Sequence, residues 1–103
     1  MRPLLDYSIS VEKICHLLSA ESEINGEVIV TGVTSDDRYV QPGDLFLAYP
    51  GKSIHGAEFA KSAIAKGARA ILTDAQGAQI AQGLPMIVVE NIRTAGALVS
   101  ART

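Results

Sequence analysis

The chain has 103 residues, of which 48% are hydrophobic and 5% aromatic, with a formal net charge of −2 and one cysteine, Cys15. This length favours a single domain with an aliphatic core. The charge argues against a nucleic-acid-binding module, and one cysteine excludes a disulfide framework and a multi-thiolate metal site. No apolar run approaches the ~20 residues of a membrane helix, and residues 1–10 lack a signal-peptide pattern, so a cytoplasmic location is expected.

The first part of the chain predicts one helix and one strand. Ser10 can cap a helix over residues 11–19, whose apolar side chains recur at helical spacing. After an Asn-Gly turn, residues 27–33 are rich in β-branched side chains and predict a strand. Pro42 and Gly43 suit the two central positions of a type II turn.

From Leu45 onward, strands and helices are expected to alternate. The predicted strands cover residues 45–49, 68–73 and 85–89, and the predicted helices cover 57–66, 75–82 and 92–103. Gly67 is placed to end the first of these helices, and Asp74 and Asn91 can cap the other two. The buried stripes are expected to be Phe59, Ala60, Ala63 and Ile64 in the first helix, and Ile92, Ala95, Leu98 and Val99 in the last. This order predicts an α/β domain, with a small sheet that is largely parallel in the C-terminal half and flanked by helices.

The last predicted helix has no stop signal before Thr103. Its apolar stripe is still in progress at that point. We therefore expect residues 1–103 to be one domain at the front of a longer protein.

Gly51-Lys52-Ser53 has the appearance of the end of a phosphate-binding P-loop. The full motif needs a glycine at position 46, which is Phe46 within a predicted strand, so a turn between strand and helix is the better interpretation. Lys52 and the amides near Ser53 remain candidates for contact with an anion, because they precede a predicted helix.

Asp36-Asp37-Arg38 is the densest charged cluster. In an extended segment the two carboxylates would point to opposite faces and could not share a metal, so an ion pair or a ligand contact is favoured over catalysis. His55 can cap a helix or touch a ligand, but it has no second ligand nearby for a metal. Cys15 is expected to be inert core, and no metal site is predicted.

The run from Val33 to Ala48 resembles the N-terminal domain of the Mur ligases, the ATP-dependent amino-acid ligases of peptidoglycan precursor synthesis. The family pattern is a Thr-x-Asp-Ser-Arg segment, then Val-x-Pro-Gly-Asp-Leu-Phe-x-Ala, a glycine turn and a helix ending before Gly-Ala and an apolar strand. Here these parts read Thr34-Ser35-Asp36-Asp37-Arg38, Val40-Gln41-Pro42-Gly43-Asp44-Leu45-Phe46-Leu47-Ala48, Gly51 and Gly67-Ala68. His55-Gly56-Ala57-Glu58-Phe59 favours the MurE type, which adds the third residue of the stem peptide, and the MurF type is the near alternative.

The resemblance implies that this domain holds the uridine-diphosphate (UDP) end of UDP-N-acetylmuramoyl-L-alanyl-D-glutamate. It also implies that ATP and Mg2+ are bound by a central domain, and that a third domain selects meso-diaminopimelate or L-lysine. The catalytic residues would then lie outside residues 1–103, and this segment alone would be inactive and bind neither cofactor.

By the same resemblance, the UDP-binding residues are Ser35, Asp37, Lys52, Ser53 and Ile54. Asp37 replaces the family serine, so a hydroxyl donor gives way to a carboxylate acceptor. A carboxylate facing a diphosphate would be unfavourable, and we expect Asp37 near the uracil or ribose, or paired with Arg38. The alternative of another class is a free-standing regulatory or interaction module without catalysis. A receiver-type regulatory domain would need a late lysine, whereas the last lysine is Lys66.

Overall fold

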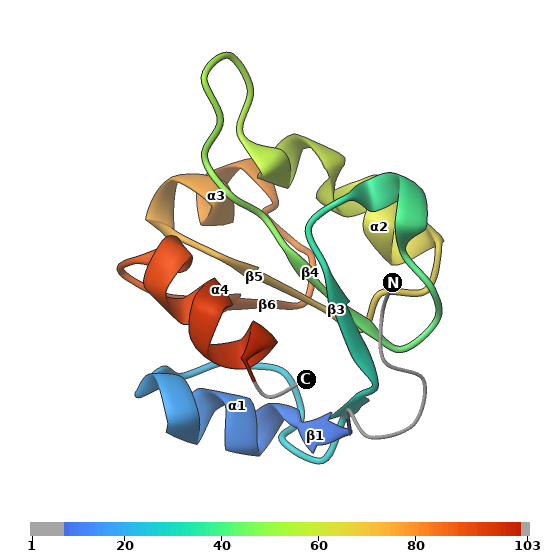
Figure 1. Ribbon diagram of the computed structural model, residues 1–103, viewed down its shortest axis with the longest axis vertical. Coiled ribbons are helices and arrows are strands. Elements are labelled where there is room, and N and C mark those ends of the chain that lie inside the picture. Colours follow the sequence, from blue (N-terminus) through green and yellow to red (C-terminus); the bar gives the residue numbers. More distant parts are fainter. Residues whose placement is uncertain (1–7, 102–103) are drawn as a thin grey trace.

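A computed structural model describes residues 8–101. Two sheets are built from strands β1 (Ile9–Ser10), β2 (Ile29–Val30), β3 (Gly32–Thr34), β4 (Asp44–Leu47), β5 (Ala70–Thr73) and β6 (Met86–Val88). The helices are α1 (Val11–Leu18), α2 (Ala60–Ala65), α3 (Ala75–Ile80) and α4 (Ile92–Ser100), with 3-10 turns η1 (Asp37–Tyr39) and η2 (Gly56–Phe59). Figure 1 shows this arrangement.

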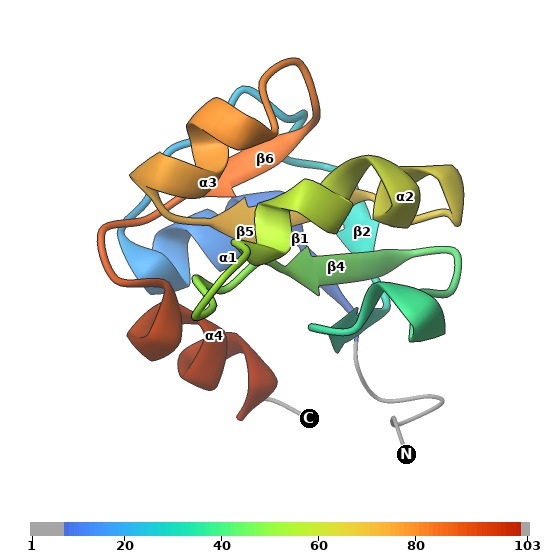
Figure 2. The same ribbon diagram turned by 90° about the horizontal axis from the view of Figure 1, so that it is seen from above.

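The main sheet has the order β3-β4-β5-β6, and every neighbouring pair is parallel. Its strands alternate side chains between two cores, as extended backbone requires. Leu45, Leu47 and Leu72 face α1 and α4, whereas Phe46 and Ile71 face α2 and the turn η2. The domain is therefore a three-layer α/β structure, which confirms the predicted fold class. Figure 1 shows the strands between α2 and α3 on one side and α1 and α4 on the other, and Figure 2 views the sheet from the side of α2 and α3.

The predicted strand over residues 27–33 is two short strands that belong to different sheets. β2 pairs antiparallel with β1, and β3 pairs in parallel with β4. Thr31 separates them, and its backbone N–H donates to the carbonyl oxygen of Gly43 at 2.9 Å. The β-branched composition predicted the extended backbone correctly but could not show that the chain changes sheets at Thr31.

Three glycines with left-handed backbone lie at the amino edge of the main sheet. Gly43, Gly67 and Gly83 have φ of 97°, 108° and 88°, and they precede β4, β5 and β6. Asp44 N donates to Gln41 O at 3.1 Å across Pro42 and Gly43, which confirms the predicted type II turn. A Cβ on Gly67 would lie 2.7 Å from the Cα of Pro42, so the first two turns pack directly on each other.

Two predicted buried stripes need correction. Phe59 is 42% exposed and Leu98 is 46% exposed. Residues 56–59 form a 3-10 turn before α2, and this change of helical period directs Ala57 inward in place of Phe59. In α4 the buried stripe is Ile92, Ala95, Gly96 and Val99, and the helix ends at Ser100. The predicted extension of this helix to Thr103 falls partly outside the described residues.

Candidate functional site

The carboxyl ends of the four parallel strands meet at one edge of the main sheet. Each strand is followed there by a residue whose side chain accepts a hydrogen bond from a backbone N–H of the next helical segment. These capping residues are Asp36 after β3, His55 after β4, Asp74 after β5 and Asn91 after β6. Open parallel sheets bind ligands outside this edge, so the loops that leave it are the candidate site.

The segment after β3 is held by its own polar side chains. Thr34 Oγ1 accepts from Asp36 N at 3.2 Å, and the Asp36 carboxylate accepts two hydrogen bonds from the Arg38 guanidinium, at 3.0 and 2.8 Å, besides the one from Arg38 N. The Arg38 guanidinium lowers the pKa of Asp36 to about 2, and Asp36 in turn raises the pKa of Arg38. Ser35 is exposed within this fixed turn.

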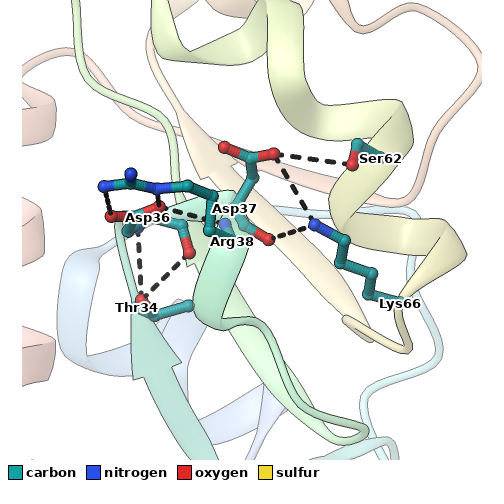
Figure 3. A network of polar contacts seen from close by, with 6 residues as sticks. All are labelled: Thr34, Asp36, Asp37, Arg38, Ser62 and Lys66. Carbon is teal, nitrogen blue, oxygen red and sulfur yellow. Dashed lines mark hydrogen bonds and ion pairs between the residues drawn. The ribbon is translucent and has the colours of Figure 1, made fainter.

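Asp37 points away from this ion pair and toward α2. Figure 3 shows its carboxylate facing Ser62 and Lys66. The Asp37 Oδ2 atom lies 3.5 Å from Ser62 Oγ and 3.9 Å from Lys66 Nζ, and Lys66 also donates to the backbone oxygen of Asp37 at 2.9 Å. The expected pairing of Asp37 with Arg38 is therefore corrected: Arg38 pairs with Asp36, because the 3-10 turn rotates Asp37 out of line with its neighbour.

The loop after β4, residues 50–54, extends beyond the sheet and is prominent at the top of Figure 1. Lys52, Ser53 and Ile54 are all exposed, with Ile54 at 52%. These residues precede a 3-10 turn and not a full helix, so the expected helix N-terminus lies farther along the chain, at Ala60.

His55 closes the loop and is buried. Its Nδ1 accepts from Ala57 N at 2.9 Å, and its Nε2 lies 2.9 Å from Asp74 Oδ1. Because Nδ1 accepts, Nε2 carries the proton and donates to the carboxylate. Burial raises the pKa of Asp74, but the hydrogen bonds from Gly77 N and His55 outweigh it, and the net pKa is lower than usual. The interpretation of His55 as a cap is confirmed.

Within residues 8–101, neither a P-loop nor a cluster of metal ligands is present. Phe46, where the P-loop motif needs its first glycine, is buried in β4 and 1% exposed, so the chain cannot wrap around a phosphate there. Across residues 8–101, no three His, Cys, Asp or Glu side chains are grouped to hold a metal ion. Gly51-Lys52-Ser53 is therefore part of a turn and not the end of a P-loop.

A groove of about 800 Å³ lies elsewhere, between residues 21–24 and β6. Glu21 and Glu23 line it together with apolar side chains such as Leu84 and Met86. Two carboxylates disfavour an anionic ligand, so we prefer the carboxyl edge as the candidate site.

Comparison with known proteins identifies the family. Residues 29–102 match the family described as "Mur ligase family, catalytic domain". The chain belongs to the Mur ligase family. This Mur ligase segment is 48% identical over 71 residues to the UDP-N-acetylmuramoyl-L-alanyl-D-glutamate--2,6-diaminopimelate ligase of Streptomyces coelicolor, covering 67% of the chain and 14% of the relative. It is 52% identical over 66 residues to the ligase of the same name from Streptomyces avermitilis, covering 62% and 13%.

The fold of this Mur ligase segment is also that of a solved structure. A crystal structure of MurF from Acinetobacter baumannii matches with a TM-score of 0.76 at 18% identity, covering 92% of the chain and 21% of that structure. At this identity the likeness shows the fold alone. Within residues 8–101, no helix is both long and apolar enough to cross a membrane.

Sequence reasoning did not identify the residues of this Mur ligase segment that contact the candidate site from distant positions in the sequence. Ser62 of α2 and Lys66, which directly follows α2, contact Asp37, and Arg93 of α4 contacts the loop after β4. The only sequence signal for them was their position in the helices predicted over residues 57–66 and 92–103. Their partners lie 25 to 43 residues away, so local patterns could not identify them.

Proposed function

We propose that this chain is the part of a MurE-type ligase that holds the UDP end of UDP-N-acetylmuramoyl-L-alanyl-D-glutamate during peptidoglycan synthesis. The observation that carries the proposal is the exposed tip, residues 51–54, of a loop at the carboxyl edge of a parallel sheet, in a chain of the Mur ligase family. The chain spans about one seventh of the curated relatives it matches. In this proposal, ATP, Mg2+ and the incoming amino acid are bound by the rest of the protein, in the cytoplasm.

Each proposed contact follows from the side chain available. Lys52 supplies a positive charge for the diphosphate, and Ser35 and Ser53 supply hydroxyl groups for uridine or phosphate oxygens. Ile54 offers an apolar surface to the base or ribose. Asp37 takes part through its backbone N–H, because its carboxylate contacts Ser62 and Lys66 and its backbone oxygen accepts from Lys66.

Sequence similarity favours the MurE type over the MurF type. The curated relatives described above are diaminopimelate ligases at 48% and 52% identity, whereas the MurF structure shares 18%. Their name also favours meso-diaminopimelate over L-lysine as the added amino acid.

The test is an NMR titration of the 15N-labelled chain with UDP. We expect weak binding, because the muramoyl and peptide portions would contact other parts of the ligase. Shift changes should concentrate at residues 33–38 and 51–56. Shift changes concentrated at the groove beside β6, or no shift changes at the highest UDP concentration used, would contradict the proposed site.

Single substitutions then separate the proposed contacts. K52A should weaken UDP binding at least threefold through loss of the only charge proposed for the diphosphate, about 0.7 kcal/mol. K13A, which removes an exposed lysine from α1, is the matched control and should leave the affinity unchanged. D37A should change the affinity less than twofold if Asp37 acts through its backbone.

A further inference from the structure

The loop 50–54 is closed at its base by the backbone. Gly56 N donates to Tyr49 O at 2.7 Å, so the two ends of the loop meet. Beyond this bond, residues 51–54 are all exposed. A short closed loop of this kind can still tilt as a unit, and its direction depends on what holds the residues at its two ends.

The later end of the loop is fixed to the sheet. His55 is 6% exposed and is held between Ala57 N and the Asp74 carboxylate that follows β5. Gly77 of α3 packs against it, since a Cβ there would lie 2.7 Å from His55 Cε1. This anchor is buried, and it belongs to the core.

The earlier end of the loop is held by α4, on the other side of the sheet. Arg93 Nη2 donates to Pro50 O at 3.0 Å, and the Arg93 guanidinium lies 5.6 Å from the centroid of the Tyr49 ring. Tyr49 in turn lies close against α4, because a Cβ on Gly96 would collide with its hydroxyl. Arg93, unlike His55, is exposed.

We propose that Arg93 is a positioning residue that sets the direction of loop 50–54 for the ligand. This inference rests on the proposed function, because the ligand of that loop is taken to be the UDP group. An arginine suits this role, because its planar guanidinium can stack on the Tyr49 ring and donate to Pro50 O at once. A lysine ammonium is a point charge that cannot stack in this way.

A merely stabilising role predicts a different outcome. Surface residues away from special features change stability little, so removal of an exposed arginine should leave the fold intact. If Arg93 positions the loop, its removal should alter the loop and its affinity while the unfolding midpoint barely moves. If Arg93 only stabilises α4, the midpoint should fall and the loop should stay unchanged.

The experiment compares R93A, R93K and the control R69A in the 103-residue chain. Arg69 is also exposed, but it precedes β5 at the opposite edge of the sheet. The readouts are the heteronuclear 15N NOEs of amides 51–54, the affinity for UDP, and the midpoint of urea unfolding.

We expect R93A to lower the NOEs of amides 51–54 and to weaken UDP binding about five- to tenfold, because the ligand must then order a loop that Arg93 orders in the wild type. R93K should recover part of this loss, since it can still donate to Pro50 O, and R69A should match the wild type. Unchanged NOEs and affinity in R93A would overturn the proposal.

Because the NOE measurement needs no ligand, it tests the role of Arg93 separately from the proposed function. If the wild-type chain fails to bind UDP, the proposed function fails. Loss of loop order in R93A would then still support positioning by Arg93, and unchanged loop order would overturn it.

Discussion

At the scale of single residues, Gly77 shows how closely the loop anchor is packed. A Cβ at this position would collide with Thr73 Oγ1 and lie 2.7 Å from His55 Cε1. Thr73 is itself buried and donates to Ala48 O at 3.1 Å. Space at Gly77 is therefore limited by two polar side chains that cannot move without losing hydrogen bonds.

We expect G77A to lower the free energy of unfolding by about 2–3 kcal/mol, because the added methyl group overpacks this contact. The neighbouring exposed substitution Q76A is the control and should change stability by less than about 0.5 kcal/mol. Urea unfolding followed by circular dichroism measures both. Equal effects of the two substitutions would show that Thr73 and His55 can move to accommodate the added methyl group.

The Asp74 carboxylate, which accepts hydrogen bonds from Gly77 N and His55, should make stability depend on pH. The folded-state pKa of Asp74 is lower than the usual value, so the unfolded chain binds more protons in acid. The stabilisation from Asp74 is thus fully present above the unfolded pKa of about 3.9 and is lost as pH falls through the folded value. The stability difference between wild type and D74N should shrink below about pH 4 in urea titrations run from neutral to acidic pH. A stability difference that stays constant over this pH range would contradict a lowered pKa of Asp74 in the folded protein.

The sequence predicted some site residues well and others poorly, for a physical reason. Asp74 and Asn91 were expected as caps, and the structure shows these local bonds. The direction of Asp37 depends on Lys66, 29 residues later, and on the rotation of a 3-10 turn. Contacts between residues that are close in sequence can be predicted from residue type, whereas contacts between distant residues can be predicted only when the tertiary structure is known.

At the scale of elements, α4 illustrates both the strength and the limit of periodicity. Its N-cap Asn91 and its buried residues Ile92, Ala95 and Val99 were predicted. Leu98 was placed on the same stripe but is 46% exposed, because Gly96 lets Tyr49 approach and sets which side of the helix faces the sheet. The pattern of hydrophobic residues cannot predict a contact of this kind, because glycine has no side chain.

Two alanine substitutions in α4 test this orientation. V99A should lower stability by about 2 kcal/mol, since it removes two buried methyl groups and leaves a cavity. L98A should cost less than about 1 kcal/mol, because much of the leucine side chain is already in water. Both values come from urea unfolding. A larger effect for L98A than for V99A would mean that the helix is rotated from the orientation described.

At the scale of the whole molecule, the two cores share one sheet. Leu72 packs in the core with α1 and α4, while its neighbour Ile71 packs in the core with α2. Neither core can be exposed without loss of β5, so the two should unfold together.

L72A and I71A test this coupling from opposite faces of the same strand. Each should lower stability by about 2–5 kcal/mol. In both variants, the urea transition observed by circular dichroism should coincide with that of NMR resonances from either core. A separate earlier transition for the core under the substituted side chain would contradict a single cooperative unit.

The contrast between the two edges of the sheet determines where this protein can accept sequence change. At the amino edge, Gly43 and Gly67 are fixed by left-handed backbone and by contact with Thr31 and Pro42, so those turns admit few other residues. At the carboxyl edge, the bond between Tyr49 and Gly56 closes the loop below its exposed tip. Residues 52–54 can therefore be replaced without altering the sheet beneath them. The fold thus separates the part that must stay constant from the part in which new ligand preferences can evolve.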